Sequence, residues 1–185
     1  MILLGCLLAV PALGAAVPAR NAGDGALSVA EGRGQVMLQG RGAAIGRFDQ
    51  GCVTIVDLTP EDLNFPLVWG DDDPQVDLPR GGVRYCGFAV RFRLIGGKFR
   101  IVAAGRGTEF SARGIELSAV GVGDGTIVTD FPRAPGVYSL DGDDCRSPRA
   151  VCKPLPTELT PFKLGTPATT RDKSGEKGLQ RIGPG

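Results

Sequence analysis

The chain of 185 residues contains no histidine. This absence excludes catalysis by a Ser-His-Asp triad or a Cys-His pair, a zinc site with histidine ligands, and pH switching by an imidazole. Aromatic residues make up only 6% of the chain, so a cleft with aromatic platforms is hard to build. The formal net charge is +1, from 21 basic and 20 acidic residues, and therefore indicates no nucleic-acid partner.

Residues 1–19 carry no acidic or basic side chain. An apolar run from Ile2 to Val10 is followed by small residues at positions 14–16, an order typical of a secretory signal peptide. A helix that spans a bilayer needs about 20 apolar residues, whereas Pro11 and Pro18 interrupt this stretch. We therefore predict a signal peptide over 1–19, a secreted or cell-envelope location, and no membrane span after cleavage. A retained membrane anchor is the alternative.

Four cysteines follow the predicted signal peptide: Cys52, Cys86, Cys145 and Cys152. An even number of cysteines in an exported chain predicts two disulfides. Cys145 and Cys152 enclose six residues, enough to close a local loop, so we pair these two and pair Cys52 with Cys86. A metal site is the weaker interpretation, because no two cysteines have Cys-x-x-Cys spacing and no histidine can complete the ligand set.

Apolar residues recur at every second position in short runs that are separated by some of the 29 glycines. Many short strands of this kind predict a single all-β domain over residues 24–164, a compact Gly-rich antiparallel sandwich or barrel. One helical turn is expected at residues 59–62, where Thr59 can cap and Pro60 suits the first helical position. Residues 165–185 are polar and rich in Gly, Thr and Lys, which predicts a disordered tail.

The diglycine Gly96-Gly97 predicts a type I′ hairpin, because both central residues of that turn need a positive φ. This register pairs Leu94 with Phe99 and sets Arg93 opposite Arg100. The side chains then sort onto two faces. The apolar face holds Val90, Phe92, Leu94, Phe99, Ile101 and Ala103, and the other face holds Arg91, Arg93, Arg100 and Val102.

A short β-solenoid is the alternative fold. Gly34 and Gly51 each begin a Gly-x-Val-x-[Leu/Ile] segment, and the interval between them recurs between Gly97 and Gly114. A repeated interval of this kind is typical of one solenoid turn. Only two such pairs occur, so the compact sandwich or barrel is preferred.

Charge is unevenly distributed along the chain. Residues 48–79 contain eight acids and no cation, and residues 78–108 contain seven cations and no acid. The acids are Asp49, Asp57, Glu61, Asp62, Asp71, Asp72, Asp73 and Asp77. We expect the acids of 57–77 to fold over Arg91, Arg93 and Arg100 and cover them. In the alternative, Arg91, Arg93, Lys98 and Arg100 stay open and bind an anionic envelope polymer such as an acidic polysaccharide.

Two acidic segments are candidate calcium loops: Asp71, Asp72 and Asp73 in one, and Asp141, Asp143 and Asp144 in the other. Neither matches the full EF-hand pattern, so solvated acidic turns are the preferred interpretation. A glycosidase needs two suitably placed carboxylates. Asp57, Glu61, Asp62 and residues 71–73 offer carboxylates, but their spacing selects no pair. We assign no catalytic residue and, calcium aside, no cofactor.

Three segments, Arg91–Arg100, Leu117–Gly121 and Tyr138–Gly142, resemble parts of uncharacterised secreted proteins of high-GC actinobacteria. The resemblance implies export and an all-β domain, and it brings no activity or site residues. The sequence thus predicts an exported, non-enzymatic binding or structural module, envelope-associated or secreted. The alternatives are a carbohydrate-active hydrolase with paired carboxylates and a calcium-stabilised adhesion module.

Overall fold

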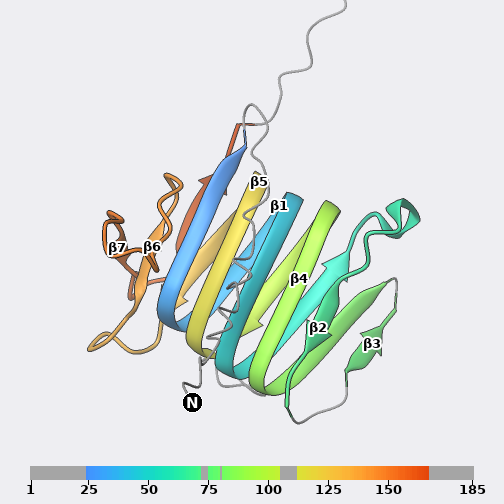
Figure 1. Ribbon diagram of the computed structural model, residues 1–185, viewed down its shortest axis with the longest axis horizontal. Coiled ribbons are helices and arrows are strands. Elements are labelled where there is room, and N and C mark those ends of the chain that lie inside the picture. Colours follow the sequence, from blue (N-terminus) through green and yellow to red (C-terminus); the bar gives the residue numbers. More distant parts are fainter. Residues whose placement is uncertain (1–23, 72–74, 80, 105–111, 167–185) are drawn as a thin grey trace, which may run out of the picture.

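The computed structural model describes residues 24–71, 75–79, 81–104 and 112–166, and Figure 1 shows its ribbon. Three long strands dominate: β1 (Gly25–Asp57), β4 (Gly82–Ala104) and β5 (Ala112–Thr129). The short strands are β2 (Leu67–Trp69), β3 (Val76–Leu78), β6 (Val137–Ser139), β7 (Lys153–Pro154) and β8 (Thr160–Leu164). Together they form one antiparallel sheet, which confirms the predicted all-β class. The predicted signal peptide and residues 167–185 of the tail lie outside the described residues.

The long strands coil, and the sheet therefore folds into two layers. Leu117 of β5 pairs with both Val29 and Gly46 of β1. Ala103 of β4 likewise pairs with both Val36 and Val53, which are separated by the same interval. Because a strand residue has only two neighbours in a sheet, β1 must return after this interval to the other side of the same partner strand. Figure 1 shows the long ribbons curving from one layer into the other at its lower edge.

We call the two layers A and B. Layer A contains residues 25–33 and 43–50 of β1, 112–120 of β5 and 87–95 of β4, with β2 and β6 at its sides. Layer B contains residues 35–41 and 52–57 of β1, 122–129 of β5, and 82–86 and 98–104 of β4, with β3 and β8 at its sides. The apolar side chains of both layers meet in one core between them.

Glycines allow the strands to cross between the layers. Gly42 of β1 pairs with Gly121 of β5, at φ of 147° and 150°. A Cβ on Gly42 would overlap the carbonyl oxygen of Val120, and one on Gly121 would overlap that of Arg41. Gly34 and Gly51, on either side of Gly42 in β1, have similar φ values. The interval between those two glycines, which the sequence repeats, is therefore one full turn of the coil.

The predicted hairpin at Gly96-Gly97 is wrong. β4 continues through both glycines, so that Arg93 lies beside Ile45 and Arg100 lies beside Gln39 on β1. The two glycines have positive φ values, 86° and 73°, as a type I′ turn would require. They instead carry β4 from layer A to layer B. A crossing reverses the chain direction as a hairpin does, so the local sequence does not distinguish the two.

The predicted sorting of side chains along β4 is confirmed. The six apolar residues of the predicted face are buried, none more than 2% exposed. Arg91, Arg93 and Arg100 are exposed, and Val102 is half-buried. Alternation along a strand is the same in a hairpin and in a strand that crosses between layers, and the core lies on the inner side in both cases.

Both predicted disulfides are present. Cys52–Cys86 joins β1 to β4 at directly paired positions. Cys145–Cys152 closes a loop that is attached to β1, because the Cys145 N–H donates a hydrogen bond to the Ser28 hydroxyl at 3.0 Å. Two disulfides indicate an oxidising, extracytoplasmic environment. No helix in the described part of the chain has the length and apolar character needed to cross a bilayer.

The predicted helical turn is present as a 3-10 turn, η1 (Pro60–Asp62). Thr59 precedes it but makes no capping hydrogen bond with its side chain. Its hydroxyl instead donates to Asp62 Oδ2 at 2.9 Å and accepts the backbone N–H of Lys98, also at 2.9 Å. The turn is thereby attached to the start of the layer B part of β4.

We expect Gly42→Ala to lower the free energy of unfolding by about 3 kcal/mol or more, since overpacking and a strained backbone each cost about 1–3 kcal/mol. Urea unfolding followed by circular dichroism measures the change. Gly81→Ala is the control: its φ is 76°, but the nearest atom to the added Cβ would be 3.5 Å away. Equal losses in the two variants would contradict the importance of the close approach.

Removal of the Cys52–Cys86 disulfide by a double Cys→Ala change should destabilise the fold more than removal of Cys145–Cys152. The two bridges span 34 and 7 residues. Loop-closure entropy then predicts losses of about 4 and about 2.5 kcal/mol. Urea unfolding of both double variants tests the order, which a larger loss for the short loop would contradict.

Candidate functional site

The four cations of the predicted basic face lie on opposite sides of the molecule. Arg91 and Arg93 belong to layer A, where they pair with Arg47 and Ile45 of β1. Lys98 and Arg100 follow the crossing at Gly96-Gly97 and belong to layer B. The prediction of one shared face depended on the hairpin and is wrong for the same reason.

The expected acidic cover over Arg91, Arg93 and Arg100 is not found. All three side chains are exposed, and none forms an ion pair with an acid that the structure describes. Asp72 and Asp73 lie outside the described residues.

Two of the acids of 57–62, Asp57 and Asp62, instead accept hydrogen bonds within their own loop. Asp57 is buried at 3% exposure, and its Oδ1 accepts the Thr59 N–H at 2.8 Å. Asp62 accepts the Asn64 N–H at 2.9 Å and the Thr59 hydroxyl. These hydrogen bonds stabilise the charged carboxylate and lower the pKa of Asp62. Short-range turn contacts thus occupy carboxylates that the sequence suggested would reach the arginines.

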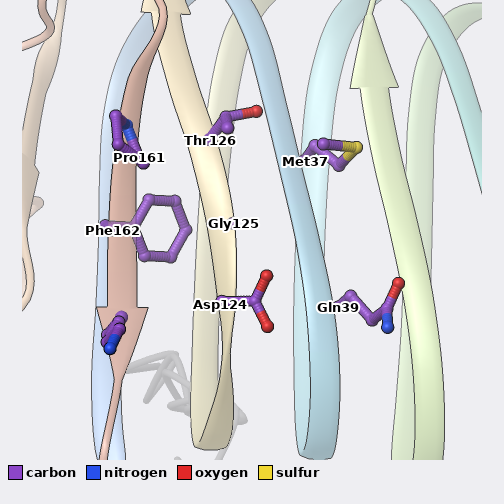
Figure 2. Close-up of a pocket in the computed structure, with 8 residues that line it drawn as sticks. Met37, Gln39, Asp124, Gly125, Thr126, Pro161 and Phe162 are labelled. Atoms are coloured by element: carbon purple, nitrogen blue, oxygen red, sulfur yellow. The ribbon is translucent and has the colours of Figure 1, made fainter.

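Layer B carries a groove of about 410 Å³ on its outer side, across β1, β5 and β8. Its lining residues are Met37, Gln39, Asp124, Gly125, Thr126, Pro161, Phe162 and Lys163. Figure 2 shows the ring of Phe162 reaching from β8 toward Gly125 on β5. A Cβ on Gly125 would lie 2.6 Å from Phe162 Cζ, so the glycine makes room for the ring. The ring packs in the core beneath the groove. The groove itself has Met37 and Pro161 at one end and Gln39 and Asp124 at the other (Figure 2).

A row of four polar side chains crosses this layer. Lys163 on β8 pairs with Asp124 on β5, Asp124 pairs with Gln39 on β1, and Gln39 pairs with Arg100 on β4. Arg100 Nε donates a hydrogen bond to Gln39 Oε1 at 2.8 Å. Asp124 and Lys163 are exposed, and neither has an ion-pair partner within the described ranges. Their charged groups are therefore available to a ligand.

Two further cations adjoin the polar row. Arg41 pairs directly with Lys98, and both side chains are exposed and lack an ion-pair partner among the described residues. Like charges at directly opposed positions are destabilising, by about 0.2–1 kcal/mol. The backbone fixes this arrangement, because the Lys98 carbonyl accepts the Leu58 N–H at 2.8 Å. An anion bound between the two side chains would relieve the repulsion.

We name this surface the cationic groove. It comprises the groove together with the exposed cations Arg41, Lys98, Arg100 and Lys163. Asp124 is the acid that lines it.

Layer A contains a comparable pair of like charges, but there the structure compensates it. Arg47 pairs directly with Arg91. Arg47 also forms two hydrogen bonds to Glu116 on β5, Nε to Oε2 at 2.8 Å and the terminal nitrogen to Oε1 at 2.7 Å. These bonds raise the pKa of Arg47. Of these two opposed pairs, Arg41–Lys98 is the one for which the described part of the chain supplies no acid.

Four residues of this surface were not predicted from the sequence: Gln39, Arg41, Asp124 and Lys163. Arg41 and Lys98 are far apart in the chain, and their proximity depends on the pairing register of β1 with β4. The repeated glycine interval is the one signal in the sequence that could have led to this register, since it gives the length of a turn.

The candidate calcium loops do not form a ligand cluster in the described residues. Both oxygens of Asp144 accept hydrogen bonds from the Arg146 guanidinium, at 2.8 and 2.9 Å. Asp71 is exposed and followed by residues outside the described ranges. Nowhere in residues that the structure describes do three Asp, Glu, Cys or His side chains gather as a metal site would need.

The carboxylates considered for hydrolysis are also poorly placed for that role. Asp57 is buried, and Asp62 is held by Thr59 and Asn64. Glu61 is exposed on η1.

Comparisons of the chain with protein-family models, with curated proteins and with solved structures find no match.

The Arg146 guanidinium lowers the pKa of Asp144 through its hydrogen bonds to the charged carboxylate. We expect Arg146→Gln to raise the Asp144 pKa toward its ordinary value of about 3.9. Because the folded-state pKa is depressed, the ion pair stabilises the fold above about pH 4, and this contribution is lost as the pH falls through the lowered pKa. Carboxyl NMR titration measures the shift. Arg149→Gln, a nearby change outside this ion pair, should leave it unchanged, and an unaltered pKa in the Arg146 variant would contradict the assignment.

Proposed function

We propose that this protein is an exported, non-enzymatic binding module, secreted or held in the cell envelope, whose cationic groove binds an anionic polymer. The two disulfides and the signal-peptide pattern support export. The all-β sandwich offers its outer layer B surface as a rigid platform, because the groove residues belong to strands rather than to loops.

One observation carries the proposal: Arg41 and Lys98 are opposed across β1 and β4 without an acid to compensate them in the described residues. Arg100 lies two positions beyond Lys98 on the same side of β4, and Lys163 lies at the far side of the groove. The positive charges are thus spread across the surface. A polymer with repeated negative charges can contact several of them at once, which raises its overall affinity.

The rest of the molecule argues for layer B over layer A. Arg91 and Arg93 are also exposed, and the exposed Trp69 and Leu67 of β2 lie beside them. On that layer, however, the directly opposed cations are Arg47 and Arg91, and Glu116 pairs with Arg47. The opposed pair Arg41 and Lys98 on layer B has no such acid among the described residues.

The test uses polygalacturonate as the anionic polymer and isothermal titration calorimetry at low salt. We expect the double change Arg41→Gln with Lys98→Gln to weaken binding by tenfold or more. The matched control, Arg91→Gln with Arg93→Gln, also removes two exposed charges and should change the affinity by less than twofold. Binding by the unaltered protein should weaken steeply as salt is added, because salt screens exposed charges.

The outcomes separate the two layers. Loss of binding in the Arg91 and Arg93 variant, with binding retained in the Arg41 and Lys98 variant, would move the site to layer A and refute the cationic groove. Absence of binding to any anionic polymer would refute the function itself.

A further inference from the structure

We infer that the cationic groove selects a carboxylated glycan, an oligosaccharide that contains uronic acid residues, over a polymer of phosphates. This inference rests on the proposed function and names the ligand class of the same site. It follows from the polar row Lys163, Asp124, Gln39 and Arg100 and from the apolar side chains beside it.

Asp124 and Lys163 are the first indication of a ligand with hydroxyl groups. They occupy directly paired positions with opposite charge, yet they form no ion pair in the described structure. A carboxylate only accepts hydrogen bonds and an ammonium group only donates them. A hydroxyl group can donate to Asp124 and accept from Lys163, so one hydroxyl can bridge the pair.

Gln39 continues the pattern. Its amide oxygen accepts the hydrogen bond from Arg100 Nε, which orients the side chain and leaves the amide N–H groups free to donate. The row therefore presents a donor at Lys163, an acceptor at Asp124 and a donor at Gln39. This alternation matches a sugar, whose adjacent hydroxyls each donate and accept.

Apolar side chains lie next to the row. Met37 and Pro161 line the groove, whereas the buried ring of Phe162 belongs to the core beneath it. Figure 2 places Met37, Thr126 and Pro161 on one side of the labelled polar residues Gln39 and Asp124. The C–H face of a sugar ring can pack against these side chains, whereas a phosphate chain has no apolar face.

Arg100 provides the place for the carboxylate. Its Nε is engaged by Gln39, so its two terminal nitrogens remain for an end-on bidentate contact with a carboxylate. Lys98 and Arg41 add positive charge on the same side. From Lys163 to Arg100 the row spans three strand spacings, or about 14 Å, which exceeds one sugar ring and suits an oligosaccharide.

Asp124 is the residue that separates the two ligand classes. For a uronate oligosaccharide it accepts a hydrogen bond from a hydroxyl group. Polyphosphate has no hydroxyl group to donate along its chain, so the Asp124 carboxylate only repels it. Removing this carboxylate must therefore weaken binding of the first ligand and strengthen binding of the second.

The experiment measures dissociation constants for the full exported domain with three probes: an oligogalacturonate, the same oligosaccharide with its carboxyl groups reduced to alcohols, and linear polyphosphate. We expect the oligogalacturonate to bind at least tenfold more tightly than either other probe. Asp124→Ala should weaken the binding of oligogalacturonate about tenfold, the size of one hydrogen bond to a charged group. The same change should strengthen the binding of polyphosphate.

The control variant is Asp77→Ala. Asp77 is an exposed acid of layer B that lies on β3, outside the groove. Its removal should strengthen both anionic probes slightly and equally, through charge alone. Lys163→Gln, a second variant in the row, should weaken the oligogalacturonate. Circular dichroism verifies that each variant is folded, as expected for exposed positions.

The possible failures are distinguishable. If Asp124→Ala strengthens the binding of oligogalacturonate as Asp77→Ala does, binding in the groove depends only on charge. That result would overturn this inference and would leave the proposed binding of an anionic polymer intact. If the reduced oligosaccharide binds as tightly as the uronate, the role of Arg100 in holding a carboxylate is overturned. If no anionic probe binds the unaltered protein, the proposed function fails together with this inference.

Discussion

The close approach of backbones where the long strands cross between layers is the constraint on which the structure depends. At Gly42 and Gly121 the chains meet so closely that a Cβ on either residue would overlap a carbonyl oxygen of the other strand. Without these crossings β1 could not lie on both sides of β5, and no core would be enclosed. The abundance of glycine in the composition is therefore, at these positions, a steric requirement of the coil.

Coiling also determines which side chains share a surface. Arg93 and Arg100 are close in the sequence and lie on opposite layers, because Gly96 and Gly97 carry the strand across between them. Arg41 and Lys98 are distant in sequence and lie side by side. The same geometry that encloses the core thus gathers cations from separate strands beside one groove, where no acid of the described residues pairs with Arg41 or Lys98. Their mutual repulsion is the physical basis for expecting an anionic ligand.

Features set by local pattern can be predicted from this sequence, and features set by register cannot. The all-β class, the inward face of β4 and the Cys145–Cys152 disulfide belong to the first kind, because alternation and short cysteine spacing are local properties. The Cys52–Cys86 disulfide spans 34 residues and could be predicted only because these two cysteines remained once the local pair was assigned. The cationic groove belongs to the second, since Gln39, Asp124 and Lys163 come together only through pairing between distant strands. The diglycine predicts the wrong connection because positive φ at both residues suits a hairpin and a layer crossing equally. The repeated glycine interval suggests a solenoid, whereas in the structure it measures one turn of this coiled sandwich.

The double pairing of β1 has a consequence for how such a domain can change in length. One inserted residue between Gly34 and Gly42 would shift the alignment against β4 and β5 at once, because this segment pairs with both. It would also move the side chain of every following residue of β1 to the opposite face of the sheet. Successive windings of β1 are separated by a winding of β5 in layer A and by a winding of β4 in layer B. A whole added winding of β1 would therefore need a matching winding in a partner strand, so this architecture can lengthen only when two strands grow together.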